Sequence, residues 1–324
     1  YWDTETSGTS TGIDNGTLTG AIGLTSAQML LQSSFAGFDF TTTPDWRIID
    51  GATRPFLPWE LISAYGGGDG SSGAPYQIAT LRQLLRLSET PSDWGAGLHF
   101  ELTADIDASG TSTWNGGTGF SPIGNGNVQF LGDFNGNGHV ITGVTINRPS
   151  DSNVGLFGQF SGNMQGLRLE SVSVSGDGRV GGLVGWNFGT ISACSASGNV
   201  SGISGVGGLV GLTSNAIDSC SAAVDVTGTR FVGGLIGKFD TCTISRCFAT
   251  GSVSGEDYIG GLAGATGGGS LTFSYALGSV TGQNMAGGLL GLAQDSGAVS
   301  FCYATGHVTS DSSVGGLVGG IVSG

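Results

Sequence analysis

The chain has 324 residues, of which 64 are glycine and only 7 are proline, and it lacks the Gly-X-Y period of collagen. Its hydrophobic fraction of 38% is too high for a disordered linker. With 24 acidic against 10 basic residues and a net charge of −14, it would repel phosphate groups, so we expect neither nucleic acid nor an anionic lipid surface as a partner. Glycine interrupts every apolar run, so no membrane insertion is expected.

Residues 1–61 are predicted to form a terminal cap segment. Thr25–Leu31 predicts a short helix, and Trp46–Asp50 and Arg54–Trp59 are aromatic-rich extended pieces. Residues 62–75 follow, and their Gly/Ser-rich stretch Gly66–Gly73 has the composition of a flexible linker.

Residues 76–153 are predicted to form an N-terminal cap and the first coils of a β-solenoid. Thr80–Leu87 has the pattern of a short amphipathic helix with a Thr-x-x-Gln capping box. Strand-like segments at Leu98–Leu102, Asp105–Asp107 and Phe130–Ile141 follow the helix. A cap is expected here because the open end of a solenoid exposes unpaired strand edges.

Residues 154–324 contain an internal repeat. The hexapeptide Val-Gly-Gly-Leu-Val-Gly and its variants begin at positions 154, 180, 206, 232, 259, 286 and 314, a spacing of 26 to 28 residues. Each period also carries a block such as Ile191–Gly202, in which apolar or small residues alternate with Ser and Thr. Short alternating runs punctuated by glycine favour strands, two or three in each period. The predicted fold is therefore all-β, a parallel β-helix (β-solenoid) with 26–28-residue coils, short capping helices and a separate N-terminal cap segment.

Most of the cysteines share one position of the repeat. Stacking of successive coils would place them in an inward ladder of small, buried side chains; a disulfide between neighbouring coils or a metal ladder are the alternatives. Cys242 lies outside this position and is the cysteine that we expect to be exposed. The residues at the shared position are Cys194, Cys220, Cys247, Ser274 and Cys302.

Few residues in the sequence suggest catalysis or metal binding. Acid–base catalysis on a β-helix needs clustered carboxylates, but the sequence has no Asp-Asp pair and its three histidines are scattered. We therefore predict no catalytic residue and no enzyme. Asp105, Asp107 and Asp133 lie in turn-rich segments near the cap, and their oxygens are candidate ligands for calcium, the one cofactor considered.

The tryptophans are either sugar-stacking platforms or aromatic residues of the cap core. Those considered are Trp2, Trp46, Trp59, Trp94 and Trp114.

The hexapeptide repeats resemble the GLUG motif of large bacterial surface proteins of the filamentous-haemagglutinin and adhesin kind. Residues 75–158 resemble the usual N-terminal run of such a unit, whereas Tyr1–Gly8, Gly23–Thr25 and Trp46–Ile48 resemble its usual end. The resemblance implies a β-solenoid at the cell surface or outside the cell. It identifies no catalytic residue.

The order of these segments is permuted, because the chain ends inside a repeat and begins with what normally follows one. This order suggests one period of a tandem array, or a subunit whose Tyr1 end completes the solenoid of its neighbour. The expected function is a non-enzymatic extracellular structural or adhesive unit that assembles end to end into a fibre or long surface stalk. The alternative is an adhesin module that acts as a monomer and binds carbohydrate, such as surface glycans, or a host surface. The residues expected to mediate self-assembly are Tyr1, Trp2, Val314, Leu317, Val318 and Ile321.

Overall fold

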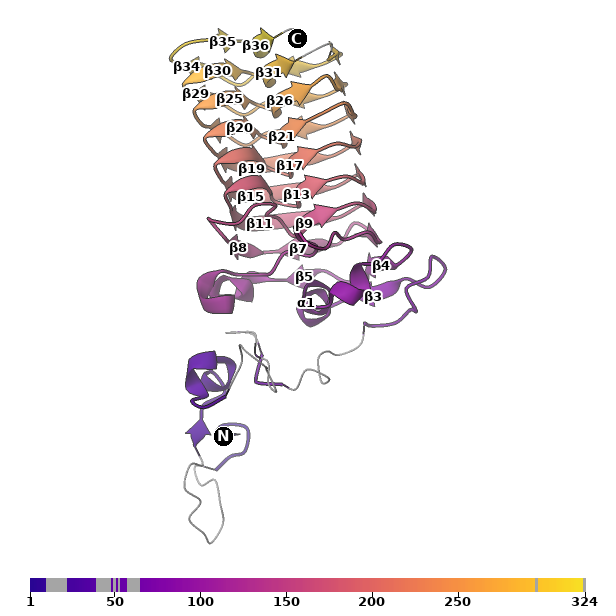
Figure 1. Ribbon diagram of the computed structural model, residues 1–324, viewed down its shortest axis with the longest axis vertical. Helices are drawn as coiled ribbons and strands as arrows, with labels where there is room; N and C mark the ends of the chain where they lie inside the picture. Colours follow the sequence, from indigo (N-terminus) through magenta and orange to yellow (C-terminus); the bar gives the residue numbers. More distant parts are fainter. Residues whose placement is uncertain are drawn as a thin grey trace.

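The computed structural model describes residues 1–9, 22–38, 48, 51, 53–56, 65–294 and 297–322. Its main body is a stack of β-coils that continues to the C-terminal end of the described chain (Figure 1). The strands of this stack pair in parallel with the equivalent strands of the next coil. The predicted parallel β-solenoid is confirmed.

The most regular coils have four strands, one in each of four sheets. The sequence pattern suggested two or three strands in each period. The coil that spans residues 178–201 is an example. Its strands are β12 (Gly178–Gly181), β13 (Val184–Asn187), β14 (Thr190–Ser192) and β15 (Ser195–Ser201). The additional strand arises because the hexapeptide bends sharply between β12 and β13, so that one motif supplies parts of two strands.

The four sheets are named here by their number of strands. The six-stranded sheet contains β12, β16 (Ser204–Gly207), β20 (Arg230–Gly233), β25 (Asp257–Gly260), β30 (Asn284–Gly287) and β35 (Val314–Gly315). The seven-stranded sheet contains β9 (Phe157–Phe160), β13, β17 (Val210–Thr213), β21 (Ile236–Phe239), β26 (Ala263–Gly267), β31 (Leu290–Gln294) and β36 (Val318–Val322). The nine-stranded sheet contains β3 (Tyr76–Ile78), β4 (His99–Leu102), β6 (Asp133–Asn135), β10 (Asn163–Gln165), β14, β18 (Ile217–Asp218), β22 (Thr243–Ser245), β27 (Ser270–Thr272) and β32 (Val299–Ser300).

The twelve-stranded sheet forms a broad face in which several coils contribute two short strands. Its members are β5 (Ile106–Asp107), β7 (Val140–Thr142), β8 (Thr145–Asn147), β11 (Arg168–Ser175), β15, β19 (Ser221–Thr227), β23 (Phe248–Ala249), β24 (Val253–Ser254), β28 (Tyr275–Ala276), β29 (Val280–Gly282), β33 (Tyr303–Ala304) and β34 (Val308–Ser310).

The register keeps equivalent residues of the repeat on top of one another. Val206 pairs with Val180 in the preceding coil and with Val232 in the following one. All three side chains are fully buried, as are the equivalent leucines Leu209 and Leu235. The apolar residues of the hexapeptide therefore form continuous columns inside the solenoid, with successive coils about 4.8 Å apart.

The glycines of the hexapeptide lie where the six-stranded and seven-stranded sheets approach each other too closely for side chains. At Gly237 on β21, a Cβ atom would lie 2.4 Å from the carbonyl carbon of Gly205 and 2.5 Å from both the Val206 nitrogen and the Gly211 oxygen. All three are backbone atoms, which cannot move aside as a side chain could. Glycine is therefore required by backbone contact at this position.

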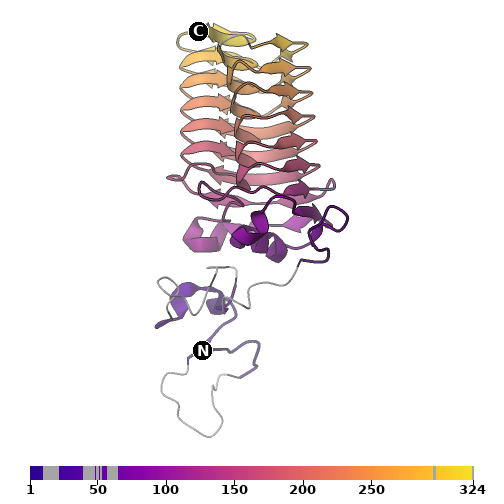
Figure 2. The ribbon, with the colours of Figure 1, turned by 45° about the vertical axis from the view of Figure 1, so that its right-hand side comes forward.

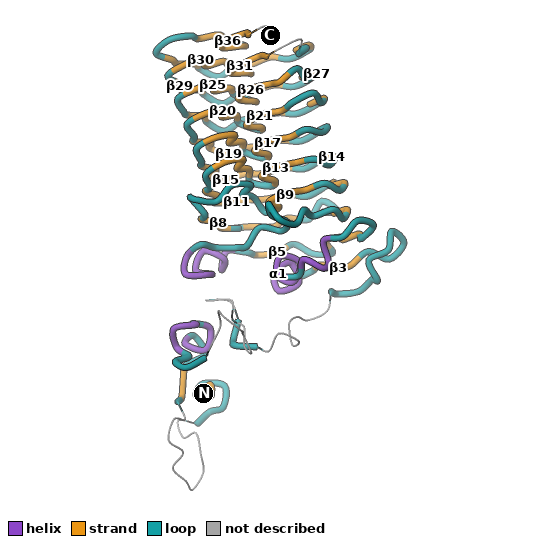
Figure 3. Tube along the Cα trace, in the orientation of Figure 1, coloured by secondary structure: helices purple, strands orange, loops and turns teal. Residues whose placement is uncertain are grey.

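A helical cap covers the other end of the solenoid (Figures 2 and 3). The predicted helix is α1 (Leu81–Glu89), and its capping box is present: Thr80 Oγ1 accepts from Gln83 N while Gln83 Oε1 accepts from Thr80 N. The helix buries Leu84 and Leu87 against the first coils. The short 3₁₀ helices η3 (Pro91–Trp94) and η4 (Ser109–Gly117) complete the cap.

The prediction of a flexible linker over residues 62–75 is wrong for the described part, residues 65–75. Gly66 N donates to Gln77 O at 2.7 Å, and Gln77 N donates to Gly67 O at 3.0 Å. Gly70 O accepts from His99 N at 2.9 Å, and Tyr65 is buried in the core of the cap. The glycines here form an ordered loop, because their unhindered backbone reaches donors and acceptors of neighbouring strands.

The N-terminal segment contains a small sheet of its own. Here β1 (Trp2–Asp3) pairs in parallel with β2 (Gly23–Leu24). The helix predicted at Thr25–Leu31 is instead the single 3₁₀ turn η1 (Gln28–Leu30), which is followed by η2 (Gln32–Ser34). The Trp46–Asp50 and Arg54–Trp59 predictions fall largely outside the described residues.

The packing at Gly237 predicts that Gly237→Ala destabilises the solenoid by about 3 kcal/mol or more, because the two sheets must separate to admit the methyl group. Gly95→Ala is the matched control, since a Cβ atom there has no neighbour within 4 Å. Urea unfolding followed by circular dichroism measures both variants. Equal stabilities would contradict the assignment of close backbone contact as the reason for glycine.

Candidate assembly interface

All four sheets end together at the last coil. Strands β32, β33, β35 and β36 are terminal members of their sheets, and β34 pairs only with β29. No other element covers these strands in the described parts of the chain, and Figures 1 and 2 show them at the end of the stack, opposite the cap. Their outer edges present unpaired backbone N–H and C=O groups, which are a template for a further strand.

This end also exposes side chains that are interior in every other repeat. Val314 is 56% exposed and Leu317 is 38% exposed, whereas the equivalent residues one coil earlier, Ala286 and Leu289, are fully buried. Ile321 is 76% exposed. The repeat residues therefore form an apolar surface at the last described coil, where no other described residues cover them.

Of the predicted assembly residues, four meet at this end. Val314, Leu317, Val318 and Ile321 lie on or between β35 and β36, where Val318 is half-buried. Tyr1 and Trp2 are the first two residues of the chain, and Figure 1 marks the N-terminus at the opposite end of the ribbon from the C-terminus. An intramolecular site made of all six is therefore excluded, whereas head-to-tail contact between two copies would bring them together.

Tyr1 and Trp2 are already part of the small N-terminal sheet. The Tyr1 ring packs edge-on against Phe35, with centroids 5.0 Å apart, and its hydroxyl donates to Ala36 O at 3.0 Å. Trp2 Nε1 donates to Thr9 O at 3.2 Å. Both side chains remain half-exposed, so this sheet can present them to a partner as a preformed unit.

Two aromatic ladders reach the open end and were not anticipated from the sequence. Tyr303 stacks on Tyr275 at 4.9 Å and 5°, and Tyr275 stacks on Phe248. Phe301 stacks on Phe273 at 4.8 Å and 4°. The outermost rings are 51% and 76% exposed, so one face of each is left without an aromatic neighbour. The signal was present in the repeat, since these rings flank the cysteine position in successive periods.

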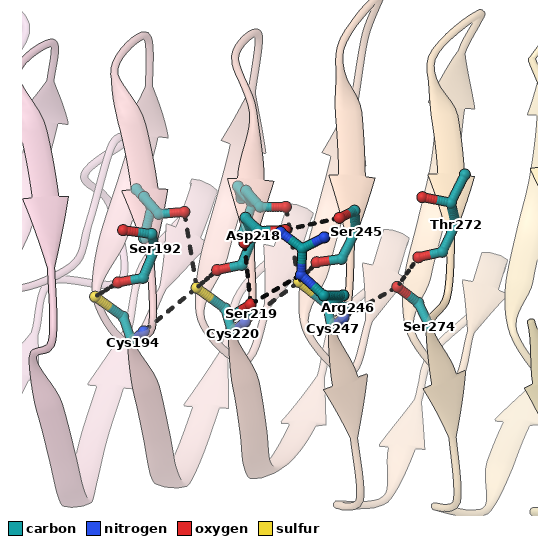
Figure 4. A network of polar contacts seen from close by, with 12 residues as sticks. Ser192, Cys194, Asp218, Ser219, Cys220, Ser245, Arg246, Cys247, Thr272 and Ser274 are labelled. Atoms are coloured by element: carbon teal, nitrogen blue, oxygen red, sulfur yellow. Dashed lines mark hydrogen bonds and ion pairs between the residues drawn. The ribbon is translucent and has the colours of Figure 1, made fainter.

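Cys194, Cys220, Cys247 and Ser274 form the predicted buried ladder, whereas Cys302 at the same repeat position is only half-buried; all five cysteines are free thiols. Figure 4 shows how it is held: Cys194 N donates to Cys220 Sγ at 3.4 Å, Cys220 N to Cys247 Sγ at 3.4 Å, and Cys247 N to Ser274 Oγ at 3.0 Å. Each of these side chains also donates to the carbonyl oxygen two residues before it. The ladder is thus a hydrogen-bonded support for one corner of the coil.

The backbone geometry of that corner explains why a hydrogen-bonding side chain is needed at the cysteine position. The residue before each ladder position has a left-handed backbone, with φ of 54° at Ser219 and 52° at Arg246. The next amide is then satisfied by a side chain of the following coil. Hydrogen bonds to Cys194 and Cys247, together with burial, raise the pKa of Cys220 well above its ordinary value, so this thiol stays protonated.

Cys242 is half-buried and packs against the core, rather than being the exposed thiol predicted. Burial and the neighbouring Asp240 carboxylate raise its pKa to about 12. Its reactivity at neutral pH is therefore low.

The three candidate calcium ligands do not converge. Asp105 accepts from Val140 N at 2.9 Å and from His139 Nδ1, and these bonds hold its pKa below the usual range. Asp107 accepts from Ser109 N at 2.9 Å, and it lies with Asp105 on the twelve-stranded face. Asp133 is on the nine-stranded sheet. Within the described residues, no group of three or more His, Cys, Asp or Glu could hold a metal ion. The prediction that these three aspartates share a calcium site is therefore wrong.

The tryptophans of the cap are core residues. Trp94 is 2% exposed, with Nε1 donating to Leu87 O, and Trp114 is 5% exposed. Neither can stack on a sugar from outside. Trp46 and Trp59 lie outside the described residues.

Comparison with known protein families supports the predicted GLUG motif. The family model named "The GLUG motif" matches residues 168–201. Halomucin of Haloquadratum walsbyi is 38% identical over 104 residues, which are 30% of this chain and 1% of halomucin. A candidate Gly-rich membrane protein of Evansella cellulosilytica is 41% identical over 86 residues, 26% of this chain and 10% of that protein. The chain therefore matches only a small part of each relative.

A solved structure shares the fold. The crystal structure of a candidate immunoglobulin A1 protease from Bacteroides ovatus superposes with a TM-score of 0.64 over 80% of this chain and 87% of that one, at 21% identity. This likeness concerns architecture alone. The chain is thus a β-solenoid that matches the GLUG motif over residues 168–201 and is similar to short segments of much longer proteins. In the described parts of the chain, no helix has both the length and the hydropathy of a membrane span.

The thiol ladder predicts different outcomes for two substitutions of Cys220. Cys220→Ser keeps the acceptor, as Ser274 does naturally, and should change the free energy of unfolding by less than about 1 kcal/mol. Cys220→Ala leaves Cys194 N without its acceptor and should cost about 1–3 kcal/mol. Denaturant unfolding measures both, and an alanine variant as stable as the serine variant would contradict the supporting role.

The N-terminal sheet should open in acid. Burial raises the pKa of Asp3, but hydrogen bonds from Thr6, Ser26 and Glu5, with the Arg54 charge, outweigh it and hold the pKa below 3.8. The stabilisation is then complete above pH 3.8 and lost as the pH falls through the lower, folded-state pKa. The NMR signal of Trp2 Nε1–H should report the opening. Asp3→Asn should remove this pH dependence; its persistence would assign the effect to another group.

Proposed function

We propose that this chain is a non-enzymatic extracellular structural unit that assembles end to end, the open last coil of one copy receiving the N-terminal end of the next. The observation that carries the proposal is that the open end repeats the chemistry of the coil interior. Val314 and Leu317 occupy repeat positions that are buried in the preceding coils, and the strands that bear them have one unpaired edge.

For two copies to associate, the last coil must both bury its apolar side chains and pair its strand edges. Fully burying a Val, Leu or Ile side chain contributes roughly 1.5–3 kcal/mol, and association costs on the order of 4–15 kcal/mol in lost freedom and ordering. The few exposed apolar side chains of the last coil therefore offset that cost only if strand pairing accompanies their burial. This condition favours a partner that brings a matching strand rather than a generic apolar ligand.

A second copy brings such an element at its other end. Strand β1 pairs with β2 only, among the described strands; it carries the half-exposed Trp2 and directly follows the half-exposed Tyr1. Aromatic side chains on this sheet suit the uncovered faces of Tyr303 and Phe301, where they would extend the two ladders. Head-to-tail contact that continues the direction of stacking adds each copy along one axis, so the product is a linear fibre or stalk.

The relatives are consistent with a place outside the cell or at its surface. One is named a Gly-rich membrane protein and the other halomucin, and the chain matches limited stretches of both. A rigid stack of coils supplies length, which supports a structural role.

Gly316 offers a selective test of assembly. It is the third residue of the last hexapeptide; at the equivalent Gly234, Gly261 and Gly288, a Cβ atom would lie 2.2, 2.0 and 2.3 Å from a carbonyl oxygen of the next coil. At Gly316 it would meet nothing within 4 Å. Gly316→Ala should therefore leave the folded chain unchanged but prevent another coil from stacking on it.

The expected result is concentration-dependent linear assembly of the wild-type chain and of the control Gly110→Ala, and its loss in Gly316→Ala. Light scattering after size exclusion and electron microscopy provide the readouts, with thermal unfolding of dilute protein as the folding check. A wild-type chain that stays monomeric at high concentration would rule out the proposal and favour the monomeric adhesin alternative. Unimpaired assembly of Gly316→Ala would place the contact elsewhere.

A further inference from the structure

A polar groove of about 350 Å³ crosses the nine-stranded sheet next to the cap. Strands β4, β6, β10 and β14 form its floor, and Ser72 and Pro75 of the ordered loop 65–75 form one wall. It lies at the cap end of the solenoid, and its lining includes none of the six residues of the proposed assembly contact. The side chains that concern its chemistry are His99, Glu101, Asp133, Asn135, Asn163 and Thr190.

One chain of hydrogen bonds fixes part of this lining. His99 Nδ1 lies 3.3 Å from Asp133 Oδ2, while Asp133 Oδ1 accepts from Asn163 N at 2.8 Å and from Asn163 Nδ2 at 2.9 Å. Asn163 Oδ1 in turn accepts from Thr190 Oγ1 at 2.7 Å. Hydrogen bonds across three successive strands, β6, β10 and β14, thus hold the Asp133 carboxylate in place, and the His99 imidazole on β4 lies against it. With Nδ1 directed to Asp133, His99 Nε2 is left as a hydrogen-bonding atom for a ligand.

The register arranges the lining in two parallel rows. His99 pairs with Asp133, and Glu101 pairs with Asn135. Asn163 and Gln165 continue the two rows in the next coil. Carboxylate, amide, imidazole and hydroxyl groups therefore recur at about 4.8 Å along each row. A ligand that matches this pattern carries both donors and acceptors at regular intervals.

The charge and polarity of the groove limit the classes of ligand that it can bind. No Arg or Lys lines it, whereas Glu101 and Asp133 do, which disfavours phosphate and acidic sugars. Phe100, Phe134 and Met164 turn inward and are about 1% exposed, so the floor has no apolar pocket for a peptide side chain. Hydroxyl groups, which donate to carboxylates and accept from amides, satisfy the lining without a charge penalty.

We propose that this groove is a binding site for a neutral saccharide chain, with His99, Asp133 and Glu101 among the groups that hydrogen-bond its hydroxyls. The site does not depend on end-to-end assembly, since all of its residues lie within one copy. Because the polar rows cross several coils, affinity should rise with the length of the saccharide as successive sugars occupy successive rungs.

The test is a titration of the full chain with neutral oligosaccharides of two to six sugars, namely cello-, laminari-, manno- and xylo-oligosaccharides, with oligogalacturonates as the acidic comparison. Isothermal calorimetry gives affinity, and the NMR signals of the His99 ring report the place of binding. His99→Ala and Asp133→Asn should each weaken binding about tenfold or more. Thr281→Ala, on the exposed twelve-stranded face, is the control that should not.

Binding of at least one neutral series, strengthened by length and weakened by the two groove variants but not by the control, would support the site. Thermal unfolding of each variant separates loss of contact from loss of fold, with Asp133→Asn as the near-isosteric change. Failure of every neutral series to bind, preference for the acidic series, or binding indifferent to His99 and Asp133 would overturn the proposal. These outcomes leave the assembly test unaffected.

Discussion

Close contact between backbones of stacked coils is the constraint on which the rest of this structure depends. The six-stranded and seven-stranded sheets approach until a Cβ atom at Gly237 would overlap backbone atoms of Gly205, Val206 and Gly211. Such proximity is possible only where side chains are absent, so the repeat must supply glycine at fixed positions. The same contact forces the hexapeptide into a sharp bend, and its remaining apolar residues then fill the interior in columns.

Because every coil uses the same residues to meet the next, the interior and the end surface are chemically the same. Val314 and Leu317 occupy the same repeat positions as their buried counterparts, but no further coil of the described chain packs on them. Packing of one coil on the next within the solenoid therefore needs no dedicated interface residue, and its specificity comes from register. The aromatic ladders and the thiol ladder add to that register, since each ring or sulfur meets its equivalent in the adjoining coil.

Chemical variety is found mainly where the repeat is least regular. In the nine-stranded sheet, the strands nearest the cap carry His99, Asp133 and Asn163 in register with Thr190 of a regular coil, and the ordered glycine loop gives the sheet a wall. A uniform solenoid face is flat and presents the same groups along its length. Interruption by the cap produces the concavity and the fixed carboxylate that a small-ligand site requires.

The sequence alone determined the solenoid, its period and its inward ladder, because a repeat of 26 to 28 residues with alternating burial has few other ways to bury its apolar face. The capping helix was also readable, since Thr80 and Gln83 are three residues apart and act locally. Which side chains meet across neighbouring coils was decided only by the tertiary structure. It separated Asp133 from Asp105, joined Asp133 to His99, and turned the glycine loop into a wall, because such contacts depend on the stacking register and on distances between backbones.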